Sequence, residues 1–107
     1  VVLGTHLLSR RDADGHYRRA QDARTRVAHD FADAFDDVDL LLTPTTPTPA
    51  FALGAATPPP DLLQHDAFTA AANLAGLPAA SLPVGRAGGL PVGAQLVAPH
   101  FGEALML

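Results

Sequence analysis

A proline-rich segment divides the sequence and limits what either side of it can fold into. Residues 43–61, TPTTPTPAFALGAATPPPD, hold six of the ten prolines together with Gly54. Proline fixes φ and has no backbone N–H, so this segment can form neither a regular helix nor a central strand. The 107 residues are enough for one small domain, whose regular elements must therefore lie on the two sides of this loop.

Before the loop, the sequence predicts a long helix and a short strand. Over residues 16–35 apolar side chains recur at three- and four-residue steps, which is typical of an amphipathic helix. Asp12 and Asp14 supply turn and N-cap chemistry ahead of it. Arg24 falls near the apolar face, where we expect its stem to pack and its charged head to lie at the edge. Residues 40–42, three consecutive leucines, predict a strand buried on both faces.

After the loop, the sequence predicts a second helix and a pair of strands. Residues 66–77 read as a short, nearly all-apolar helix that ends at Gly76 and Pro78. The stretches AASLPV and PVGAQLVA predict two strands joined by a GRAGG hairpin loop. One face of the second strand carries Val92, Ala94, Leu96 and Ala98. A last helix is expected from Glu103 onward.

These elements together predict an α/β fold. The expected architecture is a sandwich in which helices cover a mixed β-sheet. The chain opens on VVLG and closes on EALML, without a capping residue or a polar tail. We interpret these apolar ends as those of a segment of a longer protein.

The composition excludes several classes of function. The formal net charge is −4, and the six arginines between positions 10 and 26 alternate with aspartates, which favours a solvated helix face over a nucleic-acid surface. The absence of cysteine excludes a disulfide framework, a thiolate metal site and a cysteine nucleophile. No apolar run approaches the length of a membrane span and no signal peptide is recognisable, so we expect a soluble, cytoplasmic protein with no membrane contact.

Few side chains carry a recognisable catalytic pattern. Ser9 and Ser81 both lack the G-x-S-x-G context of a raised nucleophile, and the chain has no lysine to pair with a serine. His29 and Asp33 lie four residues apart on the predicted helix and are interpreted as an exposed pair rather than metal ligands. No glycine pattern matches a nucleotide-binding loop. The PTTP motif is compatible with a polyproline ligand, but its position directly after a buried strand favours a rigid loop.

Asp66 stands at the head of a stretch of small apolar residues, HDAFTAAANLAGLPAASLPVG, at positions 65–85. An aspartate directly before AFTAAANLA is a good N-cap, and local physics alone favours this scaffolding role. A helix start at a crevice can also contact a ligand. Capping and ligand binding are therefore two compatible hypotheses for Asp66.

The motifs and their order resemble those of one enzyme family. NLAGLPAASLPVG at 73–85 and GLPVGAQLVAPHFGEALML at 89–107 resemble the C-terminal part of amidase signature enzymes. LGTHLLS, AQDARTRVAHDFADAFDDVDLLLTPTTPTPAF and HDAFTAAANLAG look most like the glutaminase branch that belongs to the Glu-tRNA(Gln) amidotransferases. The resemblance covers nearly the whole chain and implies that residues 1–107 are the C-terminal portion of a single amidase domain.

The resemblance implies a glutamine-hydrolysing enzyme. Members of this family use a Ser–cis-Ser–Lys triad, which forms an acyl-enzyme and releases ammonia. The triad lies upstream in the family and this chain has no lysine, so we expect no catalytic residue here and no activity of the segment alone. The branch implies amidotransferase subunits B and C as partners, tRNA contact only through the complex, and ATP and Mg²⁺ used in one of those partners. It implies no cofactor and no metal on this segment.

One functional residue carries over from the resemblance. The acid of the family's D-x-x-T segment corresponds to Asp66 and is implied to bind the α-ammonium group of the substrate glutamine. Two alternatives stay open. The chain could belong to a stand-alone amidase-signature amide hydrolase, because residues 54–66 lack the acidic cluster common in the branch. It could also be a non-catalytic scaffold or binding domain whose proline loop recruits a partner.

Overall fold

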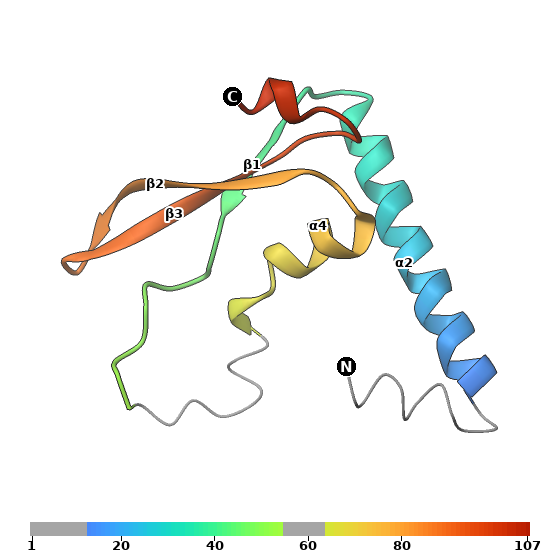
Figure 1. The fold of residues 1–107 in the computed structure, drawn as a ribbon, viewed down its shortest axis with the longest axis horizontal. Helices are drawn as coiled ribbons and strands as arrows, with labels where there is room; N and C mark the ends of the chain where they lie inside the picture. The colour runs from blue at the N-terminus through green and yellow to red at the C-terminus, as the bar shows by residue number, and fades with distance from the viewer. Residues whose placement is uncertain (1–12, 55–63) are drawn as a thin grey trace.

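The computed structural model describes residues 13–54 and 64–107 (Figure 1). Its regular elements are, in chain order, helix α2 (Ala13–Phe35), strand β1 (Leu41–Pro44), helix α4 (Thr69–Ala75), strands β2 (Ala79–Ala87) and β3 (Leu90–Val97), and the 3₁₀ turn η1 (Glu103–Leu105). After β1, residues 45–54 of the proline-rich segment hold no helix or strand. This part of the predicted loop is therefore confirmed.

Helix α2 confirms the long amphipathic helix and extends it toward the N-terminus. It begins at Ala13, so Asp14 lies inside the helix rather than in a preceding turn, while Asp12 falls outside the described residues. An acidic residue is favourable in the first turn of a helix, where the backbone N–H groups point outward. Phe31 and Phe35 lie one turn apart and stack with ring centroids 6.4 Å apart.

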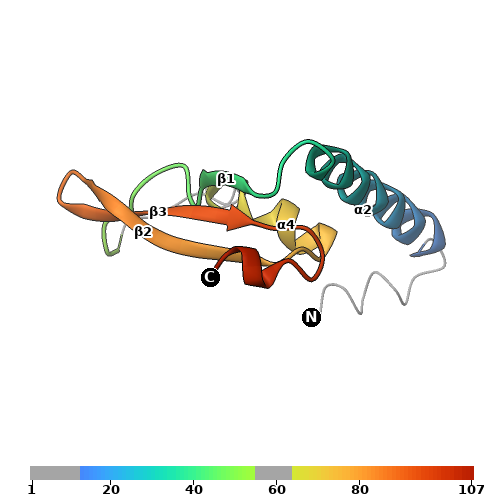
Figure 2. The same ribbon diagram turned by 90° about the horizontal axis from the view of Figure 1, so that it is seen from above.

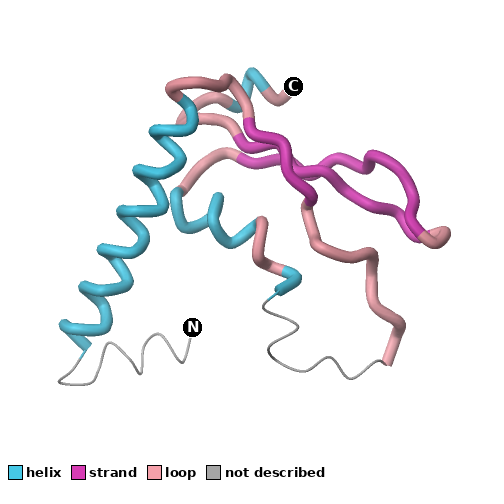
Figure 3. Tube along the Cα trace, turned by 180° about the vertical axis from the view of Figure 1, so that it is seen from behind, coloured by secondary structure: helices cyan, strands magenta, loops and turns pink. Residues whose placement is uncertain are grey.

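The three strands form one antiparallel sheet in the order β1-β3-β2. β2 and β3 are joined by the two-residue turn Gly88–Gly89, with φ of 58° and 82°, a left-handed conformation that glycine adopts without strain. The predicted hairpin is confirmed, but its loop is shorter than GRAGG because Arg86 and Ala87 still pair with β3. In Figures 1 and 3 the hairpin turn lies at the end of the sheet away from α2.

Strand β1 lies at the edge of this sheet and leaves one face open, so the predicted burial on both faces is wrong. Leu41 is half-buried, whereas the side chain of Leu42 is 70% exposed. Helix α4 contacts the face of the sheet that carries Gln95, and among the described residues no helix covers the face that carries Leu42. The α/β fold class is confirmed, and both described strand pairs are antiparallel.

Helix α4 starts later than predicted, and the prediction that Asp66 caps it is wrong. The cap residue is Phe68, which has helical backbone angles (φ −86°, ψ −30°) and no side-chain capping bond. Asp66 lies two residues earlier, where the Ala70 N–H donates to its carbonyl oxygen at 2.8 Å. A capping side chain needs an extended residue directly ahead of the helix. Here the chain is already turning in helical fashion at Asp66.

The end of α4 matches the prediction. Gly76 adopts φ 74°, its N–H donates to the carbonyl of Ala72 at 2.9 Å, and the Leu77 N–H donates to the same carbonyl at 3.0 Å. This is a Schellman-type ending, which satisfies carbonyl groups that the helix leaves open. The Ala98 N–H donates to the Pro78 carbonyl at 3.0 Å, and only residues 76–78 separate the end of α4 from the start of β2.

The core lies where α4 meets the sheet and α2. The buried apolar side chains among the described residues are Ala72, Ala75, Val97 and Ala98. Helix α2 packs against α4 beside the sheet (Figure 2). Arg24 Nε donates to the carbonyl oxygen of Leu74 at 2.7 Å and so links the two helices. Arg24 remains exposed, in agreement with its expected place at the edge of the apolar face.

Replacing Arg24 with methionine tests this link between the helices. We expect the free energy of unfolding of the whole protein to fall by about 1 kcal/mol or less, because the lost bond is charge-assisted but solvent-accessible. Arg26→Met removes an exposed arginine of the same helix and is the control, with an expected change of about 0.5 kcal/mol at most. Equal denaturant midpoints for the two variants would show that the contact with Leu74 contributes no stability.

The helix predicted from Glu103 onward is much shorter in the structure. Phe101 adopts a left-handed conformation with φ 62°, and Glu103–Leu105 form one 3₁₀ turn rather than a longer helix. Across residues 13–54 and 64–107, none of the helices has the length and apolar character needed to cross a membrane.

Candidate functional site

A small polar cavity lies between α4 and the sheet. Its volume is about 240 Å³. Its polar lining comes from Thr45, Thr69, Asn73, Ser81 and Gln95. These side chains belong to the loop after β1, to α4, to β2 and to β3, so the cavity forms only when the chain is folded.

Two hydroxyl groups form one wall of this cavity. Thr45 Oγ1 and Ser81 Oγ lie 2.7 Å apart and share a hydrogen bond, and the Thr45 N–H donates to the Gly93 carbonyl at 3.0 Å. A Cβ atom at position 93 would lie 2.9 Å from Thr45 Oγ1 and 3.0 Å from Ser81 Oγ. Gly93 is therefore required for the close approach of the two hydroxyl groups.

Gln95 connects the sheet to the start of α4. Its side chain is 5% exposed, and its Nε2 donates to the carbonyl of Phe68 at 3.1 Å and to Thr43 Oγ1 at 3.4 Å. Gln95 lies on the central strand, opposite Ser81 on β2 and Thr43 on β1. This side chain thus links the central strand to the residue directly before α4.

Asp66 borders the cavity without forming part of its wall. The hydroxyl of the wall residue Thr69 donates to the Asp66 carbonyl at 3.3 Å. Asp66, Thr69 and Asn73 follow one another at steps of three and four residues, which places them on one side of a helical segment. The Asp66 side chain is exposed, and its carboxylate makes no hydrogen bond or ion pair within residues 13–54 and 64–107.

A ring contact holds the segment just before Asp66. The rings of Phe51 and His65 lie 5.6 Å apart at an interplanar angle of 55°. This contact joins the chain on the two sides of residues 55–63. It places the described end of the proline-rich loop beside the predicted substrate-binding residue.

The other candidates from the sequence do not gather into a site. Ser9 lies outside the described residues, and Ser81 pairs with Thr45 rather than with a base. His29 and Asp33 are exposed on α2, and no group of three or more metal-ligating side chains occurs in the described part of the chain. The prolines of the PTTP motif line an open apolar groove with Leu42.

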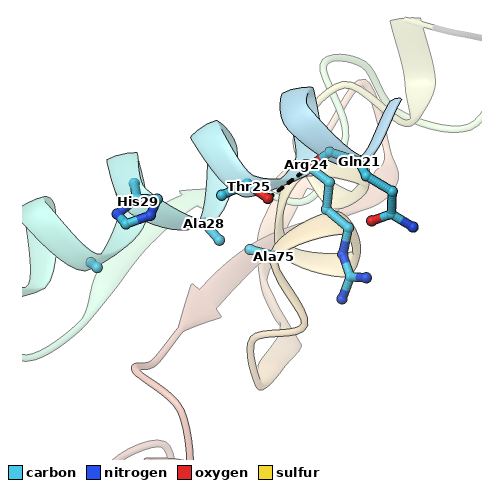
Figure 4. Close-up of a pocket in the computed structure, with 7 residues that line it drawn as sticks. Gln21, Arg24, Thr25, Ala28, His29 and Ala75 are labelled. Atoms are coloured by element: carbon cyan, nitrogen blue, oxygen red, sulfur yellow. Dashed lines mark hydrogen bonds between the residues drawn. The ribbon is translucent and has the colours of Figure 1, made fainter. Parts of the chain in front are cut away.

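A second groove runs between α2 and α4 (Figure 4). Its volume is about 340 Å³. Figure 4 shows its side chains along one side of α2, with Ala75 of α4 opposite them. Two of its polar groups are already used within the fold, because the Thr25 hydroxyl donates to the Gln21 carbonyl and Arg24 donates to Leu74. This groove is a packing seam between helices rather than a convergent site.

The comparison with known proteins agrees with the resemblance seen in the motifs. Residues 1–107 match the family model for amidases along their whole length. The chain belongs to the amidase family. It is 50% identical over 107 residues to the A-type subunit of glutamyl-tRNA(Gln) amidotransferase from Chromohalobacter salexigens and 50% identical over 111 residues to that from Salinibacter ruber. Both matches cover all of this amidase chain and 22% of the relative, so the chain spans about a fifth of the length of these curated relatives.

Solved structures of the family show the same fold. The A-type subunit of glutamyl-tRNA(Gln) amidotransferase from Thermotoga maritima matches 91% of this chain with a TM-score of 0.78 and 36% identity, using 22% of its own length. A bacterial aryl acylamidase of the amidase signature family matches 71% of the chain with a TM-score of 0.55 and 30% identity, using 18% of its own length.

The polar cavity of this amidase chain could not be found from the sequence. Thr45 and Ser81 lie 36 positions apart, and their pairing depends on the strand register rather than on any local motif. Gln95 could have been identified from the sequence, because it is the one polar side chain in the otherwise apolar stretch PVGAQLVA. A polar residue at a predicted core position indicates a specific buried hydrogen bond.

Proposed function

We propose that this chain is part of the glutaminase component of a Glu-tRNA(Gln) amidotransferase. The whole protein would hydrolyse glutamine to glutamate and ammonia, and the ammonia would serve to convert Glu-tRNA(Gln) into Gln-tRNA(Gln). The proposal is supported by relatives named as the A-type subunit of this amidotransferase, which match the chain from end to end at 44–50% identity. These relatives are about five times longer than the chain, so the activity is that of the whole protein.

Asp66 is the residue of this chain that we assign to substrate binding. A carboxylate that binds the α-ammonium group of glutamine must be exposed to the ligand and must not be neutralised by the protein. The carboxylate of Asp66 is exposed and has no ionic partner among the described residues, and this is the observation that supports the assignment. A charge-assisted bond between an ammonium and a carboxylate is about twice as strong as a neutral hydrogen bond.

In this proposal the side chains that break the amide bond of glutamine lie elsewhere in the whole protein. Residues 1–107 form the C-terminal portion of its amidase domain, and the Ser–cis-Ser–Lys triad precedes them. The chain contains no lysine, so the triad cannot be completed within it. We expect the isolated chain to release no ammonia from glutamine.

The proposed complex contains subunits B and C, which would bring tRNA to the ammonia, in the cytoplasm. ATP and Mg²⁺ would be used in one of these partners to activate the glutamyl group. Within residues 13–54 and 64–107 no group of three or more potential metal-ligating side chains is present.

A second candidate function is favoured by the structural likeness to the bacterial aryl acylamidase. In that case the whole protein would act alone on another amide, and Asp66 would not face an ammonium group. The lower TM-score and shorter coverage of that match, compared with the amidotransferase structure from Thermotoga maritima, favour the glutaminase.

The two candidates are separated by offering the whole protein two substrates. The protein, co-purified with subunits B and C, is assayed for glutamate release from glutamine and for arylamine release from a simple acetanilide. We expect glutamate release with little anilide hydrolysis. Rapid anilide hydrolysis without glutaminase activity would overturn the proposal in favour of the stand-alone amidase.

A further inference from the structure

Gln95 is the buried polar side chain of the described residues that reaches across elements. It lies on β3, between β1 and β2, so its backbone is held by a neighbouring strand on each side. Its amide Nε2 donates to the carbonyl oxygen of Phe68 at 3.1 Å. This bond joins the central strand of the sheet to Phe68, the residue directly before α4.

Phe68 and Asp66 belong to the same turn, and hydrogen bonds to the Asp66 carbonyl hold this turn to the start of α4. Phe68 lies two residues after Asp66, in the same turn. The Ala70 N–H and the Thr69 hydroxyl both donate to the Asp66 carbonyl, at 2.8 Å and 3.3 Å. Holding Phe68 in place therefore holds the turn, and with it the direction in which the exposed carboxylate of Asp66 projects.

We propose that Gln95 is a positioning residue for glutamine binding, which it supports by fixing the turn that carries Asp66. This inference rests on the proposed function and adds to it a residue that does not touch the substrate. A binding group must be held within about 0.5 Å of its productive position. The sheet can provide that accuracy because Gln95 lies on its central strand, which pairs with a strand on each side, whereas the turn at Asp66 is exposed.

A purely structural role for Gln95 makes a different prediction. Loss of a buried hydrogen bond would then lower the melting temperature or the fraction of active enzyme, but the enzyme that remains folded would bind glutamine normally. A positioning role changes the affinity of the folded enzyme. The KM for glutamine and the kcat therefore separate the two roles, because loss of binding alone raises KM and leaves kcat unchanged.

The test uses Gln95→Met in the whole protein with subunits B and C. Methionine keeps the length of the side chain and removes the donor. We expect the KM for glutamine to rise about five- to tenfold, the effect of one lost hydrogen bond, with kcat changed less than about twofold. Gln21→Met makes the same chemical change on α2, where among the described residues the Gln21 side chain hydrogen-bonds only to Tyr17 of its own helix, and should leave both constants unchanged. If Gln95→Met does not fold, Gln95→Asn keeps the amide but is one methylene too short to reach Phe68.

A double-mutant cycle with Asp66→Asn then tests whether Gln95 changes the KM for glutamine through Asp66. If Gln95 acts through Asp66, adding Gln95→Met to Asp66→Asn should raise KM by less than about twofold, because coupled residues are non-additive. A full five- to tenfold further rise, or an unchanged KM in the single Gln95 variant, would overturn the positioning role alone. If Asp66→Asn itself leaves KM unchanged, the assigned substrate contact fails and the positioning role fails with it.

Discussion

Replacing Asp66 with asparagine in the whole protein is expected to lower kcat/KM for glutamine by about one to two orders of magnitude. The change removes the negative charge and keeps the size of the side chain, so the ammonium group of the substrate loses a charge-assisted partner. Folding should be unaffected, because the Asp66 side chain makes no hydrogen bond within the described residues and the turn is held through its carbonyl oxygen. Steady-state glutamate release measures the effect.

An ammonium salt supplied in place of glutamine provides the matching control. If Asp66 serves only to bind glutamine, the Asp66→Asn complex should amidate Glu-tRNA(Gln) with ammonium as fast as the unaltered complex does. Asp30→Asn, an exposed aspartate on α2, makes the same chemical change away from the cavity and should leave both reactions intact. An unaltered kcat/KM for glutamine in Asp66→Asn would rule out the assigned contact.

Gly93→Ala is expected to destabilise the protein by about 1–3 kcal/mol, the usual cost of forcing an extra group into a packed site. The new Cβ would lie about 3 Å from the hydroxyl oxygens of both Thr45 and Ser81, so their 2.7 Å hydrogen bond must break or shift. Thermal or denaturant unfolding of the whole protein measures the loss. The polar cavity should change with it, because both hydroxyl groups form its wall.

Two further variants show whether the crowding is the cause. Gly85→Ala adds the same methyl group to β2, where a Cβ would meet nothing within 4 Å, and should be nearly neutral. Ser81→Ala removes one of the two crowding oxygens, so Gly93→Ala should cost less in that background than alone. Equal losses in Gly93→Ala and Gly85→Ala would show that the hydroxyl wall tolerates the extra group.

The helix α2 and the β2–β3 hairpin could be predicted because their signals are local. The periodicity of residues 16–35 and the glycine pair at 88–89 each specify a structure without reference to distant residues. The start of α4 could not be predicted this way. Asp66 satisfies the local rule for an N-cap, but the helix begins after Phe68, whose carbonyl accepts a hydrogen bond from Gln95 of another element, and a local pattern does not reveal such a tertiary contact.

The exposure of Leu42 shows a second limit of local patterns. Three consecutive leucines indicate an apolar strand, but they do not say which neighbours cover each face. In the sheet β1 is an edge strand and α4 covers only the opposite face. The site shows the same limit. Asp66 was predicted from the family resemblance, whereas the Thr45–Ser81 pair could not be predicted because only the folded chain brings these two residues together.

Helix α4 is held at both ends through backbone atoms, so its side chains toward the cavity can be replaced without removing either anchor. At its start the Phe68 carbonyl accepts from Gln95, and at its end the N–H groups of Gly76 and Leu77 close the last turn. Neither anchor depends on the side chains along the exposed side of the helix. Asn73, which lines the polar cavity, takes part in neither anchor, so a substitution at this position should change the lining of the cavity while both ends of the helix stay held.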